Sequence, residues 1–240
     1  MAVHTTQLLG KERVAEGTME FRFAKPEGFT FRAGQFVEMK LIHPAENDDE
    51  GNIRPFSIAA APHGTELMFA TRMRDSAFKR VLGNLKEGSE VELEGPYGSF
   101  FLHEDASKPA VFLVGGIGIT PFRAMLRDAA RRKLPHRIFL FYANRRPEDT
   151  PFLNELLAMG QENPNYRFIG TMTRVRESKE EWRGETGHIT GAMLRKYLPT
   201  LEHTMFYSAG PQGMVSAMRE MLTANGVDLD HIRTEEFSGY

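Results

Sequence analysis

The sequence predicts two parts of different class: a small antiparallel β barrel or sandwich, then an α/β domain with a mostly parallel sheet. Short, alternating or β-rich segments fill the first hundred residues, whereas strands alternate with amphipathic helices in the rest. A polar segment that ends in proline, residues 102–109, separates the two patterns. We therefore expect one domain at residues 1–104 and a second at residues 105–240.

Strand character in the first part is concentrated in short segments with Pro, Gly, Asn and Asp clustered between them. These segments are 19–24, 35–42, 54–59, 67–73 and 90–95. A helix is expected within 76–85, where apolar residues recur at helical spacing. The acidic segment 45–52 is predicted to be a solvated hairpin loop, since Ser57 stands where a calcium loop needs its last glutamate.

The second part begins with a strand at 111–114 and a helix from about Phe122. Further strands are expected at 137–143, 166–172, 204–209 and 231–237, and further helices at 151–159, 191–198 and 213–222. Such βαβ units form a parallel sheet with helices on both faces, and ligands bind beyond the carboxyl ends of its strands.

Composition excludes several function classes. A net charge of −2 gives no reason to expect nucleic acid as the partner. With no cysteine, the chain has no disulfide, no cysteine nucleophile and no cysteine-held zinc or iron–sulfur cluster, and we expect no metal site. No apolar run reaches the roughly 20 residues of a membrane span, and no signal peptide is recognised. A cytoplasmic location is expected.

Two glycine turns lie at predicted strand ends. In "VFLVGGIGITP" a buried strand enters Gly-Gly-Ile-Gly and then a helix, an arrangement that presents backbone N–H groups to a phosphate. The second turn, "SAGPQGM" at 208–214, also leads into a helix, so both turns can line one crevice. The alternatives are a glycine needed only for packing and an ordinary strand-to-helix connection.

The third motif is "RPFS" at 54–57. Strand alternation places Arg54 and Phe56 on one face and Ser57 on the other. Arginine can bind a phosphate, an aromatic ring can stack on a planar ring, and serine can hydrogen-bond a ring nitrogen. The alternative is an arginine paired with an acid beside a core phenylalanine.

Together, and in this order, the three motifs resemble those of the ferredoxin–NADP reductase superfamily, over nearly the whole chain. The resemblance implies an N-terminal antiparallel Greek-key barrel that binds flavin, followed by a C-terminal Rossmann-like parallel-sheet domain that binds NAD(P). It implies FAD, with FMN less expected, and NADPH or NADH as cofactors. The expected enzyme is an NAD(P)H-dependent flavoprotein reductase. It would pass a hydride to FAD and then electrons to a separate acceptor, such as a ferredoxin or an oxygenase component.

For the flavin, the resemblance assigns Arg54 to the pyrophosphate, Phe56 to the isoalloxazine and Ser57 to a position near N5. The expected flavin residues are Arg54, Pro55, Phe56, Ser57, Phe69, Ala70, Thr71, Arg72, Ser76, Ala77, Phe78 and Lys79. The last four replace a Gly-x-x-Ser pattern of many members, which leaves FAD versus FMN open. The ending "EEF" resembles the acid-x-aromatic that covers the flavin, so Ser57, Glu235 and Phe237 are the catalytic candidates, with Tyr240 as the alternative to Phe237.

For the nicotinamide dinucleotide, the resemblance implies Gly116, Gly118, Thr120, Pro121, Asn144, Arg145, Thr173, Arg174, Gly210, Pro211 and Met214. Ala209 stands where the family has a cysteine. Thr173 and Arg174 stand where members that prefer NADPH carry Ser-Arg, which favours NADPH; an ordinary basic surface loop is the alternative. Asn144 and Arg145 have a similar alternative, a loop with exposed charges.

Two other functions stay open. A flavin reductase, which shares the "RPFS" pattern, would use free flavin as its partner and release it reduced. A non-catalytic nucleotide-sensing module would keep the fold without turnover, and only Ala209 points that way.

Overall fold

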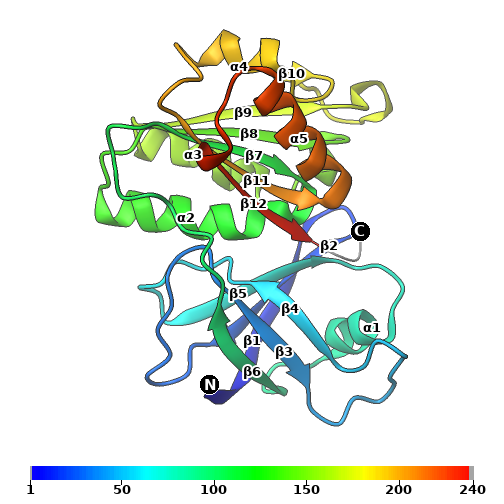
Figure 1. The fold of residues 1–240 in the computed structure, drawn as a ribbon. Helices are drawn as coiled ribbons and strands as arrows, with labels where there is room; N and C mark the ends of the chain where they lie inside the picture. Colours follow the sequence, from blue (N-terminus) through cyan, green and yellow to red (C-terminus); the bar gives the residue numbers. More distant parts are fainter. Residues whose placement is uncertain (1, 238–240) are drawn as a thin grey trace. The chain divides into compact units, whose positions relative to one another are not determined.

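An antiparallel sheet of six strands, in the order β4-β3-β6-β1-β2-β5, makes up the first unit of the chain (Figure 1). The computed structural model describes residues 2–237. The strands are β1 (Val3–Ala15), β2 (Thr18–Ala24), β3 (Phe36–Leu41), β4 (Ile53–Ser57), β5 (Glu66–Arg72) and β6 (Glu90–Tyr97). The two ends of this order meet where the Ala59 N–H donates to the Met68 carbonyl oxygen at 2.8 Å. The predicted antiparallel barrel is therefore confirmed.

The longest of these strands, β1, was not predicted from the sequence. Its inward positions are Thr6, Leu8 and Gly10, so only one of them carries a large apolar side chain. The strand is held instead by its neighbours, since residues 3–7 pair with β6 and residues 8–15 pair with β2. Pairing along the whole strand therefore holds β1 without the usual hydrophobic alternation.

Aromatic rings fill the barrel core. Phe56 lies 6.1 Å from Phe69 and 5.9 Å from Phe78, between ring centroids, and all three are buried. Phe78 belongs to α1 (Ala77–Asn84), which begins where predicted because the Ser76 hydroxyl accepts the Lys79 N–H at 3.3 Å as an N-cap. The first unit consists of residues up to 101 together with 120–128.

The second unit is built on a parallel sheet in the order β10-β9-β8-β7-β11-β12. The strands are β7 (Ala110–Gly115), β8 (Ile138–Asn144), β9 (Tyr166–Met172), β10 (Glu185–Thr186), β11 (Met205–Pro211) and β12 (Ile232–Phe237). The helices of this part of the chain are α2 (Ile119–Arg132), α3 (Leu153–Glu162), α4 (Gly191–Tyr197) and α5 (Gln212–Ala224), and residues 120–128 of α2 are grouped with the first unit. Every residue of β7 is buried, as its continuous apolar sequence predicts.

Helices lie on both faces of this parallel sheet. Met193 and Leu194 of α4 share one apolar cluster with Met218 and Leu222 of α5, so these two helices cover the same face, while α3 lies on the other (Figure 1). The α/β class predicted for this part is confirmed. Among the described residues there is no helix with the length and apolar character needed to cross a membrane.

A buried polar cluster lies before the amino end of β7. The Tyr207 hydroxyl accepts the backbone N–H of His103 at 2.8 Å and lies 3.0 Å from its ring Nδ1. The ring Nε2 of His103 lies 3.0 Å from the carbonyl oxygen of Lys108, and the carbonyl of His103 meets Nε2 of His136 at 2.8 Å. These bonds tie the segment that precedes β7 to β11. Burial lowers the pKa of His103.

Replacing Tyr207 with phenylalanine should lower the free energy of unfolding by about 1–2 kcal/mol, because it leaves a buried backbone N–H without its acceptor. The matched control is Tyr166→Phe, since the Tyr166 hydroxyl is buried and has no hydrogen-bond partner among the described residues. That variant should be neutral or slightly stabilising. Urea denaturation followed by circular dichroism measures both; equal losses would show that the His103 contact adds nothing.

Candidate functional site

Two glycine turns lie side by side at the carboxyl edge of the parallel sheet. β7 ends at Gly115, a 3₁₀ turn follows at Gly116–Gly118, and α2 begins at Ile119. β11 ends at Pro211 and passes directly into α5. Because β7 and β11 are parallel neighbours, with Val114 opposite Ala209, the structure brings the two predicted motifs together.

Close packing explains several glycines in these turns. A Cβ atom on Gly118 would lie 2.3 Å from the carbonyl oxygen of Ala209, and one on Gly115 would lie 2.3 Å from the Met214 sulfur. Gly116 has φ +53°, a conformation that favours glycine. Close packing therefore does require glycine at these positions. This requirement is compatible with a phosphate site, because the close approach of the first turn to β11 and to Met214 sets the shape of that turn. Thr120 and Pro121 are buried in the first turn of α2.

Two side chains on one face of this sheet, near its carboxyl edge, have buried atoms without a hydrogen-bond partner among the described residues. They are both amide atoms of Asn144 and the Oε2 atom of Glu235. The unpartnered hydroxyl of Ser208 lies on the opposite face of the sheet, and that of Tyr166 lies at the amino end of β9. Asn144 ends β8, and Glu235 lies in the carboxyl half of β12. Buried polar atoms normally have partners, so an unsatisfied set near one edge of a sheet indicates a place for a polar ligand.

Glu235 has a perturbed acidity. It lies opposite Ala209 in the β11–β12 pair, and burial raises the pKa of its carboxyl to about 7. A carboxyl with this pKa can hold or release a proton near neutral pH. Phe237 lies opposite Pro211 at the end of β12. Tyr240, the alternative to Phe237, lies outside the described residues.

Two joined segments carry Thr173 and Arg174, predicted for the adenosine 2′-phosphate, and Asn144 and Arg145, predicted to line the nucleotide. The Thr173 N–H donates to the Asn144 carbonyl at 3.0 Å, and the Arg174 N–H donates to the Arg145 carbonyl at 2.8 Å. Thr173, Arg174 and Arg145 are exposed, and the Arg174 guanidinium lies 3.7 Å from the Glu177 carboxylate. The structure thus places the four predicted residues together at the carboxyl ends of β8 and β9.

In the barrel, Arg54 is half-buried and already paired. Its Nη2 donates to Glu50 Oε2 at 2.7 Å and to Asp48 Oδ1 at 3.4 Å. Its guanidinium carbon lies 5.3 Å from the centroid of the Phe78 ring. The sequence allowed two interpretations of Arg54, a phosphate contact or an ion pair beside a core phenylalanine. The structure shows the second, an arginine paired with acids beside core aromatic rings. Both acids come from the loop between β3 and β4. This loop connects two antiparallel strands, as predicted, but its Asp48 and Glu50 carboxylates are paired with Arg54, whereas a solvated loop was predicted.

The other predicted flavin residues divide by burial. Phe56, Phe69 and Phe78 belong to the core, so little of their surface is open to a ligand. Ser57 and Arg72 are half-buried, and the Nε atom of Arg72 is buried without a partner among the described residues. Buried residues of the predicted set also include Ala70, Thr71 and Ala77, whereas Pro55 is exposed.

Positive charge gathers at the beginning of α1. The pKa of Lys79 is lowered by burial first, and then by the nearby charges of Arg74 and Arg54. Lys79 lies in the first turn of the helix, where the helix dipole already disfavours a cation, and this turn contains no acidic residue. A group of cations at this helix end is suited to binding an anion.

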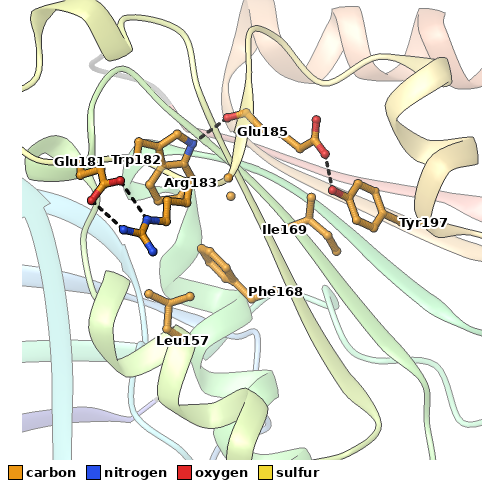
Figure 2. Close-up of a pocket in the computed structure, with 10 residues that line it drawn as sticks. Leu157, Phe168, Ile169, Glu181, Trp182, Arg183, Glu185 and Tyr197 are labelled. Carbon is orange, nitrogen blue, oxygen red and sulfur yellow. Dashed lines mark hydrogen bonds and ion pairs between the residues drawn. The ribbon is translucent and has the colours of Figure 1, made fainter.

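A pocket that sequence reasoning missed lies at the β9 edge of the parallel sheet (Figure 2). It has a volume of about 440 Å³, and its lining includes Leu157, Phe168, Trp182 and Tyr197. The indole Nε1–H of Trp182 donates to the Glu185 carbonyl at 2.8 Å. None of the residues predicted to bind a cofactor lines this pocket, and the single tryptophan was its only signal in the sequence.

Comparison with known proteins agrees with this architecture. A family model described as the oxidoreductase NAD-binding domain matches residues 112–220. The glycine betaine monooxygenase reductase subunit of Chromohalobacter salexigens is 30% identical over 223 residues, which are 92% of this chain. The match spans 60% of that relative, so the chain is shorter than the whole reductase subunit.

Two further proteins match along nearly their whole length. Ferredoxin–NADP reductase B of Sorangium cellulosum is 28% identical over 233 residues, 91% of this chain and 90% of that protein. The crystal structure of a ferredoxin NADP⁺ reductase from Neisseria gonorrhoeae, with bound FAD and NADP, has a TM-score of 0.82 and 21% identity. The match covers 98% of this chain and 98% of the Neisseria gonorrhoeae chain. The fold is shared from end to end.

Proposed function

The chain belongs to the ferredoxin–NADP reductase superfamily, and from that premise we propose that it is a flavoprotein reductase that oxidises NAD(P)H. The observation that carries the proposal is the pair of side chains with unsatisfied buried atoms, Asn144 and Glu235, on one face of the sheet beside the paired glycine turns. These groups fit a polar dinucleotide, which would supply their missing partners.

Residues 105–240 are proposed to hold the nicotinamide dinucleotide. The turn Gly116–Gly118 and the segment Gly210–Met214 would bind the pyrophosphate, as glycine turns at helix starts do in parallel sheets. Arg174 and Arg145 would place positive charge at the adenosine end, with the Thr173 hydroxyl beside them. This charge favours the 2′-phosphate of NADPH over the bare ribose of NADH.

Residues 1–104 are proposed to hold the flavin, and FAD is favoured. Arg54, Lys79 and the first N–H groups of α1 supply cationic and dipolar contacts for its phosphates. Ser57 would orient the flavin ring through its hydroxyl, and Phe237 would cover the ring. The cations grouped around the beginning of α1 fit a phosphate group.

When bound, FAD supplies the redox chemistry, since it accepts a hydride from NAD(P)H and passes electrons to an acceptor. The protein would bind FAD and NAD(P)H and orient them for the reaction. Glu235 holds or releases a proton at its buried carboxyl near neutral pH. We propose a separate electron-carrier protein, such as a ferredoxin or an oxygenase component, as the acceptor, because the relatives named above are reductases of these two kinds. A cytoplasmic location is part of the same proposal and rests on the cysteine-free sequence.

A flavin reductase that releases reduced flavin is the second candidate. The pairing of Arg54 with Glu50 and Asp48 favours it, because a phosphate-binding arginine with two internal partners holds flavin less tightly.

An anaerobic visible spectrum of the purified protein, reconstituted with FAD, tests the proposal. We expect oxidised-flavin absorbance that bleaches on addition of one equivalent of NADPH, and bleaches more slowly with NADH. Flavin that co-purifies would favour the electron-transfer reductase, and flavin lost on gel filtration would favour the flavin reductase. Bound flavin that neither nucleotide bleaches would contradict both, as a nucleotide sensor would behave this way.

A further inference from the structure

The acidic loop between β3 and β4 folds back onto the beginning of α1. Asp48 connects the two features directly: its Oδ2 accepts the Ala77 N–H at 3.0 Å, while its Oδ1 accepts from the Arg54 guanidinium at 3.4 Å. One carboxylate therefore bridges a helix-start N–H and an arginine. A phosphate oxygen pair would make the same two contacts, since both groups are compact anions that accept from several donors.

The loop also saturates much of the Arg54 guanidinium. Nη1 donates to the carbonyl oxygens of Glu50, Gly51 and Ile53 at 2.8, 3.0 and 2.8 Å, and Nη2 donates to the Glu50 carboxylate at 2.7 Å. The Arg54 side chain is only 19% exposed, whereas that of Glu50 is 75% exposed. A phosphate that binds Arg54 has to replace the carboxylates, and the exposed Glu50 is the easier of the two to displace.

Independent observations show that this place is suited to an anion. Lys79 and Arg74 add cations beside Arg54, and burial together with these two arginines lowers the Lys79 pKa. The first turn of α1 has no acid of its own, so the loop is the source of the negative charge that Ala77 and Arg54 contact.

We propose that Asp48 and Glu50 are an internal anion that competes with the flavin phosphate for Arg54 and the beginning of α1, and thereby makes the bound flavin exchangeable. The inference rests on the proposed flavin function and deepens it by assigning two residues that set flavin retention. Flavins with phosphate compete with the loop. Riboflavin has no phosphate and does not.

The test is a flavin titration of apo-protein by fluorescence quenching, with FAD, FMN and riboflavin, for wild type, Asp48→Asn and the double variant Asp48→Asn/Glu50→Gln. Asparagine keeps the oxygen that accepts the Ala77 N–H, so the fold of the loop is retained. We expect the double variant to bind FAD and FMN about three- to tenfold more tightly than wild type, a range set by the usual strength of partly exposed ion pairs. Riboflavin affinity should not change.

Asp49→Asn is the matched control. Asp49 is an exposed carboxylate of the same loop and makes no ion pair among the described residues, so this variant removes one negative charge, as Asp48→Asn does, without touching Arg54. It should bind all three flavins as wild type does.

Two results would overturn the proposal. If wild type binds FAD but the double variant binds it no more tightly, or if Asp49→Asn tightens binding equally, the loop carboxylates do not compete at Arg54, and the flavin function stands alone. If wild type binds no flavin at any concentration, the proposed function itself fails and the inference falls with it. Thermal melting of each variant confirms that the apo-proteins compared are folded.

Discussion

Replacing Gly118 with valine is expected to lower the free energy of unfolding by about 3 kcal/mol and to remove nucleotide binding. A Cβ atom at this position would lie 2.3 Å from the Ala209 carbonyl oxygen, 2.6 Å from its carbonyl carbon and 2.8 Å from the Gly210 Cα. All three are backbone atoms of β11, so no side-chain rotation relieves the overlap. The turn after β7 must move away from β11, which disrupts the packing of both turns.

Gly160→Ala is the control for this substitution. Gly160 lies inside α3, and a Cβ atom there would meet nothing within 4 Å. Adding that atom should stabilise the protein by about 0.5–1 kcal/mol, since alanine favours helix. Urea denaturation measures both variants, and isothermal titration with NADPH measures binding. A Gly118→Val protein as stable as wild type would show that the turn can accommodate a side chain at this position, contrary to the prediction.

Most of the fold was predictable because hydrophobic periodicity is a local signal. Every predicted strand and helix is present, and β9 (Tyr166–Met172) has the predicted bounds. The two strands that were not predicted, β1 and β10, are held by pairing with neighbouring strands and lack a hydrophobic pattern of their own. β1 has few buried apolar residues and is stabilised by pairing with β6 through residues 3–7 and with β2 through residues 8–15. The two-residue β10 exists only because Glu185 and Thr186 pair with the end of β9.

The candidate site could also be predicted from the sequence only in part. The sequence predicted the glycine turns and the elements that contain them, and the structure places those turns together. For Arg54 the sequence left two interpretations open, because it cannot show that the loop 45–52 folds back to pair with this arginine. The pocket beside Trp182 was not predicted, since its walls come from α3, β9, α4 and the segment 181–185, which only the tertiary fold assembles.

The acidity of Glu235 could not be read from the sequence either, because it results from burial, and it leads to the second large expected effect. Burial raises the carboxyl pKa from 4.5 to about 7. Between these two values the folded protein holds a proton that the unfolded chain releases. The free energy of unfolding must therefore fall as the pH rises through this range. We expect a loss of about 2 kcal/mol between pH 5 and pH 8, after allowance for the partial exposure of the side chain.

Glu235→Gln should lack this pH dependence, because its amide does not titrate in this range. The quantity to compare is the change in unfolding free energy between pH 5 and pH 8 in each protein, measured by urea denaturation, since the other titrating groups cancel in the difference. Glu236→Gln alters the exposed neighbour on the same strand and should behave as wild type. If Glu235→Gln loses as much stability as wild type over this range, Glu235 is ionised throughout. It then cannot exchange a proton near neutral pH, and its proposed part in the reaction has no support.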